Sequence, residues 1–219
     1  MPRVLFEKTG NAIFISHLDL MRLFQRAFKR AGLPLKHSQG FSPRPFVAIA
    51  LPLSVGVESK CELLDFELEG ESIPCEEIAQ RLNDALVEGV VVRQVYEDGK
   101  KIKHLAYLSC VVTLEYDQGV PASAAEQLAD LFRRDSLTVS KKGKNGVTEQ
   151  DIIPMIRKLD VVTVDDRTLE LRALVCCQNP SLNPMQLAAA IDAYLPELTP
   201  DFAKCRREEI FGADETIFR

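Results

Sequence analysis

Long apolar runs are missing from this chain of 219 residues, and so is a signal-peptide pattern at its start. No apolar stretch approaches the roughly 20 residues that a membrane-spanning helix needs. The first residues, MPRVLFE, place an acid within the apolar stretch and offer no cleavage pattern. We therefore expect a cytoplasmic protein that has no membrane partner.

The six cysteines form none of the spacings that hold metals. The sequence has no CxxC pair and no CxxxCxxC motif, and zinc-ligand spacing with the three histidines is missing too. We expect buried, reduced thiols and neither a metal nor a cofactor. The phosphate-binding motifs GxxxxGK[ST] and GxGxxG and the nucleophile motif GxSxG are also absent, so the sequence carries no common nucleotide-binding or hydrolase signature.

The order of the hydrophobic patterns predicts an α+β protein made of two tandem ferredoxin-like (βαββαβ) units. A first domain, residues 1–98, would carry a basic helix and an SxGFxPxP loop, and residues 104–219 would form the second. The first half is expected to hold strands at 3–8, 12–15, 46–53, 62–69 and 90–96, and helices at 17–31 and 75–87.

The second half repeats this order of patterns without a visible repeat of residues. Strands are expected at 107–116, 137–141, 168–178 and 203–211, and helices at 122–134 and 184–194. The lysine-rich segment 141–146 is predicted to be a basic loop. Residues 151–164 fit neither a helix nor a strand pattern clearly.

Positive charge is concentrated near the start of the chain. Residues 1–50 carry eight Lys or Arg and two acids, whereas the whole chain has a net charge of −5, and no acid lies between Leu20 and Val57. This asymmetry favours an anionic partner such as phosphate or RNA, although a solvated helix face is the plain alternative. The cations expected along one face of the first helix are Arg22, Arg26, Lys29 and Arg30.

The loop that follows this helix has rigid and aromatic residues beside its charges. Aromatic rings interleaved with cations suit a single-stranded base, while a purely structural loop remains the alternative. Its candidate ligand-binding residues are Lys36, His37, Ser38, Phe41 and Arg44. Gly40, Pro43 and Pro45 would shape its backbone, as would Gly56 further along.

His17 is the one candidate catalytic residue. At the first turn of a helix, a neutral imidazole could act as a base. Asp19 lies two residues away and would face elsewhere, so we expect it to cap the helix together with Ser16. Among the later acids Glu58 is the best placed to reach the site, and those of the strand at 62–69 would form a solvated face.

Several segments resemble one bacterial family. They are FEKTG (6–10), ISHLDLMR (15–22), RAGLP (30–34), SQGFSPRP (38–45), LPLSVGVES (51–59) and DIIP (151–154). The family is the radical-SAM-associated domain of unknown function, found beside or fused to B12-binding-type radical SAM proteins. The resemblance is dense over residues 3–60. Its matched positions are His17, Asp19, Arg22, Ser38, Gly40, Phe41, Pro43, Arg44, Pro45, Gly56 and Glu58.

The resemblance implies a radical SAM protein as partner and a role in RNA or translation-related modification. Three hypotheses follow. The first is an accessory RNA- or substrate-binding partner of a radical SAM enzyme that has no catalytic activity of its own. The second is an RNA-processing or RNA-modifying enzyme that uses His17 as base, with His37 or Arg44 stabilising charge. The third is a protein-interaction module that binds no nucleic acid.

Overall fold

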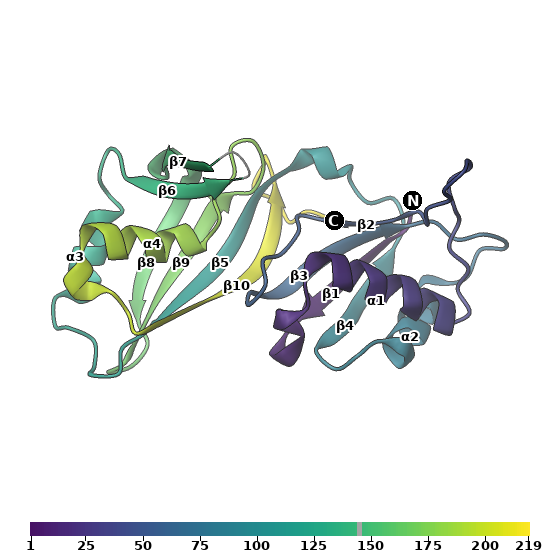
Figure 1. Ribbon diagram of the computed structural model, residues 1–219, viewed down its shortest axis with the longest axis horizontal. Coiled ribbons are helices and arrows are strands. Elements are labelled where there is room, and N and C mark those ends of the chain that lie inside the picture. Colours follow the sequence, from purple (N-terminus) through teal and green to yellow (C-terminus); the bar gives the residue numbers. More distant parts are fainter. Residues whose placement is uncertain (144–145) are drawn as a thin grey trace. The chain divides into compact units, whose positions relative to one another are not determined.

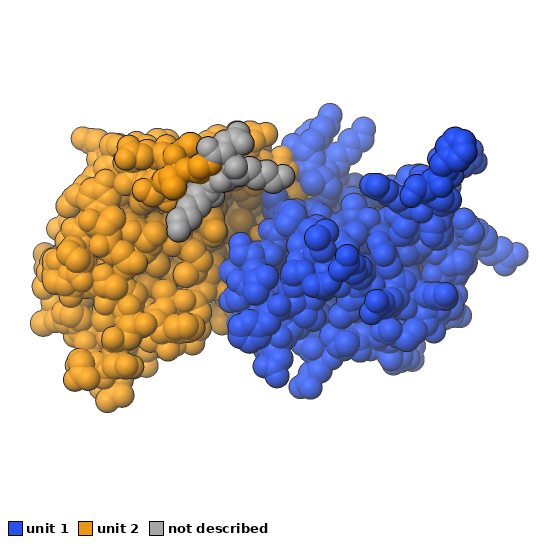
Figure 2. Space-filling view, viewed as in Figure 1, with its two compact units in different colours: residues 1–104, 219 blue, residues 105–218 orange. Residues whose placement is uncertain are grey.

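The computed structural model describes residues 1–143 and 146–219 (Figure 1). The chain divides into two compact units, residues 1–104 with Arg219 and residues 105–218 (Figure 2). Both units combine helices with antiparallel strands, so the prediction of a mixed helix-and-strand protein is confirmed.

The first unit alternates strands and helices in the order strand, helix, strand, strand, helix, strand. Its elements are β1 (Arg3–Lys8), α1 (His17–Arg30), β2 (Val47–Ala50), β3 (Glu58–Phe66), α2 (Cys75–Ala85) and β4 (Val90–Tyr96). The strands pair antiparallel in the order β4-β1-β3-β2. A short 3-10 helix, η2 (Ile102–His104), ends the unit.

One expected strand of the first unit is wrong. Residues 12–15 belong largely to a 3-10 helix, η1 (Gly10–Phe14), rather than to a bent hairpin. Gly10 has φ +54°, and the amide of Ala12 donates to the carbonyl of Thr9 at 3.1 Å. This tight turn leaves the following residues coiled instead of extended.

Both helices of the first unit share one core with the sheet. From α1, the residues Leu20, Phe24, Ala27 and Phe28 are buried, at the helical spacing expected from the sequence. The ring of Phe24 meets that of Phe6 edge-on with centroids 4.7 Å apart, and Phe28 lies 5.0 Å from Phe66. Because α2 adds Ile78 and Leu82 to the same core, both helices cover the same face (Figure 1).

The second unit has the same order of elements with a hairpin inserted. Its sheet elements and helices are β5 (Leu105–Glu115), α3 (Ala124–Leu131), β8 (Ile156–Thr163), β9 (Thr168–Cys176), α4 (Met185–Tyr194) and β10 (Phe202–Gly212), and the order in the sheet is β10-β5-β9-β8. The hairpin consists of β6 (Thr138–Gly143) and β7 (Gly146–Asp151). Short 3-10 helices lie at η3 (Ile153–Met155) and η4 (Pro196–Leu198).

Two expectations for the second unit are corrected. The strand expected at 137–141 pairs within the β6–β7 hairpin and not with the sheet that contains β5 and β9. The basic loop expected at 141–146 is instead strand at 141–143 and 146, and residues 144–145 lie outside the described part of the chain. The unassigned segment 151–164 supplies β8 instead. Since β8 is paired with β9 and half of its residues are only partly buried, its sequence keeps no clean alternation.

All six cysteines are free thiols, and four of them are buried: Cys61, Cys110, Cys177 and Cys205. A hydrogen bond with Cys205 and burial raise the pKa of the Cys110 thiol, and burial raises the pKa of Cys177 to about 11. Thiols held in this state are poor nucleophiles and act as small apolar side chains.

Helix α1 ends at a glycine in the left-handed region, and this leads to a stability prediction. Gly32 has φ +66°, and the amides of Gly32 and Leu33 donate to the carbonyls of Lys29 and Phe28 at 3.2 and 2.9 Å. A Cβ at Gly32 would meet no atom within 4 Å. We expect Gly32→Ala to lower the free energy of unfolding by about 1–2 kcal/mol from backbone strain alone.

Chemical denaturation measures this change. Gln80→Ala, on the exposed side of α2, serves as the control and should be close to neutral, because alanine is favoured inside a helix. Equal stability of Gly32→Ala and the parent protein would contradict the role given to this glycine.

Candidate anion-binding surface

A hydrogen-bonded cap fixes the start of α1. The amide of Asp19 donates to Ser16 Oγ at 3.2 Å, and Ser16 Oγ in turn donates to Asp19 Oδ2 at 2.7 Å. The second carboxylate oxygen accepts from Arg22 Nη1 at 2.9 Å. These hydrogen bonds lower the pKa of Asp19 and keep it ionised, and the bond from Ser16 contributes most to the shift. Ser16 thus caps the helix together with Asp19, as the sequence predicts, and Asp19 also partly neutralises Arg22.

Three arginines of α1 line one hollow, which we call the arginine groove. Arg22, Arg26 and Arg30 lie on its wall, and its volume is about 470 Å³. They follow one another every four residues, which on an α-helix is a step of about 6 Å. Arg30 is anchored by a bond from Nη2 to the carbonyl of Ala85 at 2.6 Å. Ile15, Leu23, Val87 and Asp19 complete the lining.

A second hollow lies on the other flank of α1, and we call it the proline groove. Its volume is about 730 Å³, and Lys29 and His37 lie in its lining together with Pro34 and Pro45. The four cations of the helix are therefore all exposed but do not serve a single groove. Arg22, Arg26 and Arg30 line one groove and Lys29 the other.

The loop between α1 and β2 is closed by its own hydrogen bonds. The amide of Ser38 donates to the carbonyl of Arg44 at 2.8 Å, and the amide of Arg44 donates to Ser38 Oγ at 3.0 Å. Lys36 forms an ion pair with Glu67 at 2.9 Å, and its ammonium lies 5.7 Å from the ring centre of Phe46. Ser38 and Lys36 thus hold the loop in place, while Phe41 is fully exposed.

The remaining candidates lie elsewhere in the first unit. His17 is the first residue of α1 and is half-buried, and it lines neither groove. Arg44 and Phe41 are exposed on the loop beyond the proline groove. Gly56, with φ +84°, donates its amide to the carbonyl of Ile13 at 2.9 Å, which joins the turn before β3 to η1. Glu58 opens β3 and is partly buried.

The expectation of a solvated acidic face on β3 is wrong for Glu62. This residue is completely buried, on the same face of β3 as Leu64. Lys8 is buried too and donates from Nζ to the carbonyl of Ile13 at 3.1 Å. Burial lowers the pKa of Lys8, and the charge of Glu62 partly offsets that effect. The buried Lys8 therefore supports η1 just before α1 begins, and Glu62 lies close enough to act on its charge.

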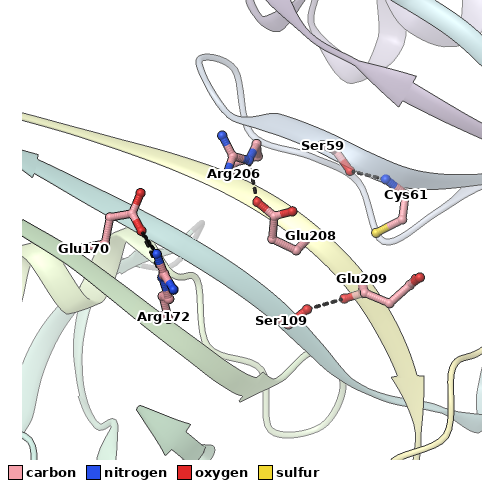
Figure 3. Close-up of polar contacts among 8 residues, drawn as sticks. All are labelled: Ser59, Cys61, Ser109, Glu170, Arg172, Arg206, Glu208 and Glu209. Carbon is pink, nitrogen blue, oxygen red and sulfur yellow. Dashed lines mark hydrogen bonds and ion pairs between the residues drawn. The ribbon is translucent and has the colours of Figure 1, made fainter. Parts of the chain in front are cut away.

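Two arginines on the strands of the second unit are paired with near neighbours (Figure 3). Arg172 Nε donates to Glu170 at 2.9 Å, and Arg206 pairs with Glu208. Residues two apart on a strand share a face, so each pair neutralises its own charge locally. In the same view, Ser109 Oγ donates to the carbonyl of Glu209 at 3.5 Å. Within the first unit, the amide of Cys61 donates to Ser59 Oγ at 3.2 Å.

Arg26 contrasts with these paired arginines. Its guanidinium is exposed and forms no ion pair or hydrogen bond with any residue that the structure describes. A cation in this state is ready to bind an anion from solution, because no internal partner must be displaced. The arginine groove therefore combines one available cation, Arg26, with two that are already oriented by Asp19 and Ala85.

Asp151, which the sequence left unassigned, is a structural residue. Its Oδ1 accepts from the amides of Leu137 at 2.9 Å and Ile153 at 3.1 Å, and so it closes the base of the β6–β7 hairpin. The bond from Leu137 is the main reason why the pKa of Asp151 is lowered.

This geometry leads to a pH-dependent prediction. The pKa of Asp151 is lower in the folded protein than in the unfolded chain, where it is about 4. The ionised side chain therefore stabilises the fold at pH values above about 4, and this stabilisation is lost as the pH falls through the pKa of the folded protein. We expect Asp151→Ala to be less stable than the parent protein at neutral pH, and the difference to shrink in acid. Denaturation across pH 2 to 7 measures this. Asp151→Asn, which keeps an acceptor oxygen, should lose less, and a pH-independent difference would contradict the assignment.

The described residues contain no group of three or more His, Cys, Asp or Glu side chains that could hold a metal ion. No helix among them has the length and apolarity needed to cross a membrane.

Comparisons with known proteins place the chain in a family. It belongs to the bacterial family described as "uncharacterized protein conserved in bacteria (DUF2344)", whose profile matches residues 2–184. This agrees with the resemblance to a bacterial domain of unknown function. No curated protein sequence matches the chain.

Among solved structures, one chain in the crystal structure of a Cbf5-Nop10-Gar1 complex is similar, with a TM-score of 0.50 and 8% sequence identity. The match covers 95% of the present chain and 48% of that chain, so the present protein spans about half of its length. At this level of identity the similarity concerns the fold alone.

Proposed function

We propose that this protein is a non-catalytic RNA-binding partner of a radical SAM enzyme, built on two tandem ferredoxin-like units. The shared element order and the strand orders β4-β1-β3-β2 and β10-β5-β9-β8 support the fold assignment. The arginine groove carries the functional part of the proposal, because it gathers Arg22, Arg26 and Arg30 beside a single acid.

The spacing of the arginines suits a phosphate chain. Successive arginine positions on α1 are about 6 Å apart along the helix, a step comparable with that between neighbouring phosphates on a nucleic-acid strand. Arginine forms two parallel hydrogen bonds with a phosphate, and clustered arginines release counterions on binding. Ile15, Leu23 and Val87 add apolar surface to the lining of the groove.

Two substitutions with opposite effects test the groove. Arg26→Ala should weaken RNA binding and reduce the slope of log affinity against log salt by about 0.7, since one phosphate contact is lost. Asp19→Asn should strengthen binding, because it frees Arg22 while Ser16 Oγ still accepts from the amide of residue 19 and caps the helix. Fluorescence anisotropy with labelled single-stranded RNA over a range of salt concentrations measures both changes.

Arg81→Ala is the matched control, because Arg81 lies on α2 and is already paired with Glu77. It should leave affinity and salt slope close to those of the parent protein. Salt-independent binding, or equal loss in Arg26→Ala and Arg81→Ala, would overturn the proposed role of the arginine groove. Improved binding in Asp19→Asn cannot arise from a damaged fold, so it separates a charge effect from instability.

The partner in the proposal is supported by sequence and by surface. The resemblance to domains found beside radical SAM proteins suggests which protein would bind. Phe14, Leu18 and Val55 are each more than half exposed, and the bond between Gly56 and Ile13 joins the segments that carry Phe14 and Val55, while Leu18 follows Phe14 by four residues. Exposed apolar side chains that gather on one surface mark sites that a second protein covers.

We expect Leu18→Asp to reduce copurification with the radical SAM protein of the same genome at least tenfold. An acid in the first turn suits the helix dipole, so α1 should remain folded. Val164→Asp, at an apolar position of the second unit that is also more than half exposed, is the control. The pull-down includes RNase, so a lost partner is not lost RNA, and RNA binding by Leu18→Asp should weaken slightly because the new carboxylate lies four residues before Arg22. Full recovery of the partner with Leu18→Asp would place its binding surface elsewhere.

A further inference from the structure

The proline groove has the size and the floor of a site for a flat ring. Its volume of about 730 Å³ is in the range of sites that bind small ligands. Leu33 and Leu35 are buried beneath it, and Pro34 and Pro45 add rigid apolar surface. Rings of nucleobases stack on surfaces of this kind with little dependence on their orientation.

The backbone around the groove is fixed before any ligand binds. The amide of Glu69 donates to the carbonyl of Pro34 at 2.8 Å, and a bridge joins Leu35 to Leu68. A second bridge joins His37 to Pro45 across the loop. A site that is already ordered binds its ligand without the cost of ordering loops.

The rim of the groove carries polar side chains that the fold does not use. Gln25, Lys29, His37 and Glu69 line it, and none of these side chains forms a hydrogen bond or ion pair within the described part of the chain. Two of them are oppositely charged: Lys29 suits a phosphate oxygen, whereas the carboxylate of Glu69 only accepts hydrogen bonds. Such a rim matches a ligand with an anionic part and an N–H donor on its ring.

Lys29 connects this groove with the arginine groove. It follows Arg26 by three residues, which puts it less than one turn further along α1 and about 60° around the helix axis. A strand whose phosphates lie along Arg22 and Arg26 therefore reaches Lys29 next. A base attached at that point lies on the side of α1 where the proline groove opens.

We propose that the proline groove binds one nucleobase of the strand held by the arginine groove, and that Glu69 selects a base with an exocyclic amino group. This rests on the proposed function. Lys29 holds the phosphate of that nucleotide, the ring lies on Pro34 and Pro45, and the Glu69 carboxylate accepts the hydrogen bond of the amino group. Uracil presents a carbonyl at the corresponding position and would face the carboxylate unfavourably.

Oligocytidylate and oligouridylate of equal length test this with the full chain. The two bases have the same ring size and differ in the amino or carbonyl group and in the proton on the neighbouring ring nitrogen, so the ratio of their affinities reports on this hydrogen-bonding edge. We expect a preference for cytidylate of about fivefold in the parent protein. Glu69→Gln should abolish or reverse it, because the amide can donate to the uracil carbonyl. Glu71→Gln, which makes the same change of charge outside the groove, should retain it.

The outcomes separate this inference from the proposed function. Equal, salt-dependent binding of the two oligonucleotides would overturn base selection and leave the RNA-binding role intact. A preference that persists in Glu69→Gln would overturn the assignment to Glu69. No binding of either oligonucleotide at low salt would overturn the RNA-binding proposal and this one with it.

Discussion

The packing of α1 on its sheet through Phe24 and Phe28 determines where the charges of the first unit lie. Each ring is fully buried against an aromatic partner on a strand, Phe6 or Phe66. Replacing a phenylalanine buried in this way by alanine typically costs about 3–5 kcal/mol. Two such contacts, one turn apart, leave α1 little freedom to rotate. Arg22, Arg26 and Lys29 are on the opposite side of the helix and are therefore held towards solvent.

The same constraint explains why like charges can remain close together on this helix. Neighbouring cations on a helix repel one another by roughly 0.2–0.5 kcal/mol per pair. This repulsion is small compared with the stabilisation from the packing of Phe24 and Phe28, so the row of cations on α1 does not unfold the helix. Asp19 and the carbonyl of Ala85 each stabilise one arginine and leave Arg26 open. The resulting surface is stable without a ligand and is still attractive to an anion.

The sequence was sufficient to predict those features of the structure that depend only on neighbouring residues. The cap at Ser16, the buried face of α1 and the stop at Gly32 each depend on a few neighbouring residues and agree with expectation. Charge spacing likewise indicated the cations of α1. It could not divide them between two grooves, because the walls come from Val87 on one side and from His37 and Pro45 on the other. The burial of Glu62 was missed for the same reason, because it depends on pairing with β1, which is distant in sequence. β8 pairs with the adjacent β9 and was missed because its own residues lack a clear alternation.

The division of the cations between two flanks suggests how affinity and selectivity would be separated. Contacts between arginine and phosphate do not depend on the base sequence, so the arginine groove alone would bind any strand. A pocket with a hydrogen-bond acceptor and an apolar floor distinguishes bases but contributes little charge. Lys29 lies between the two and is the one helical cation that lines the proline groove among the residues described. One turn of α1 would then connect the arginine groove, which binds any strand, to the proline groove, which selects a base, because both flanks of the helix are exposed to solvent.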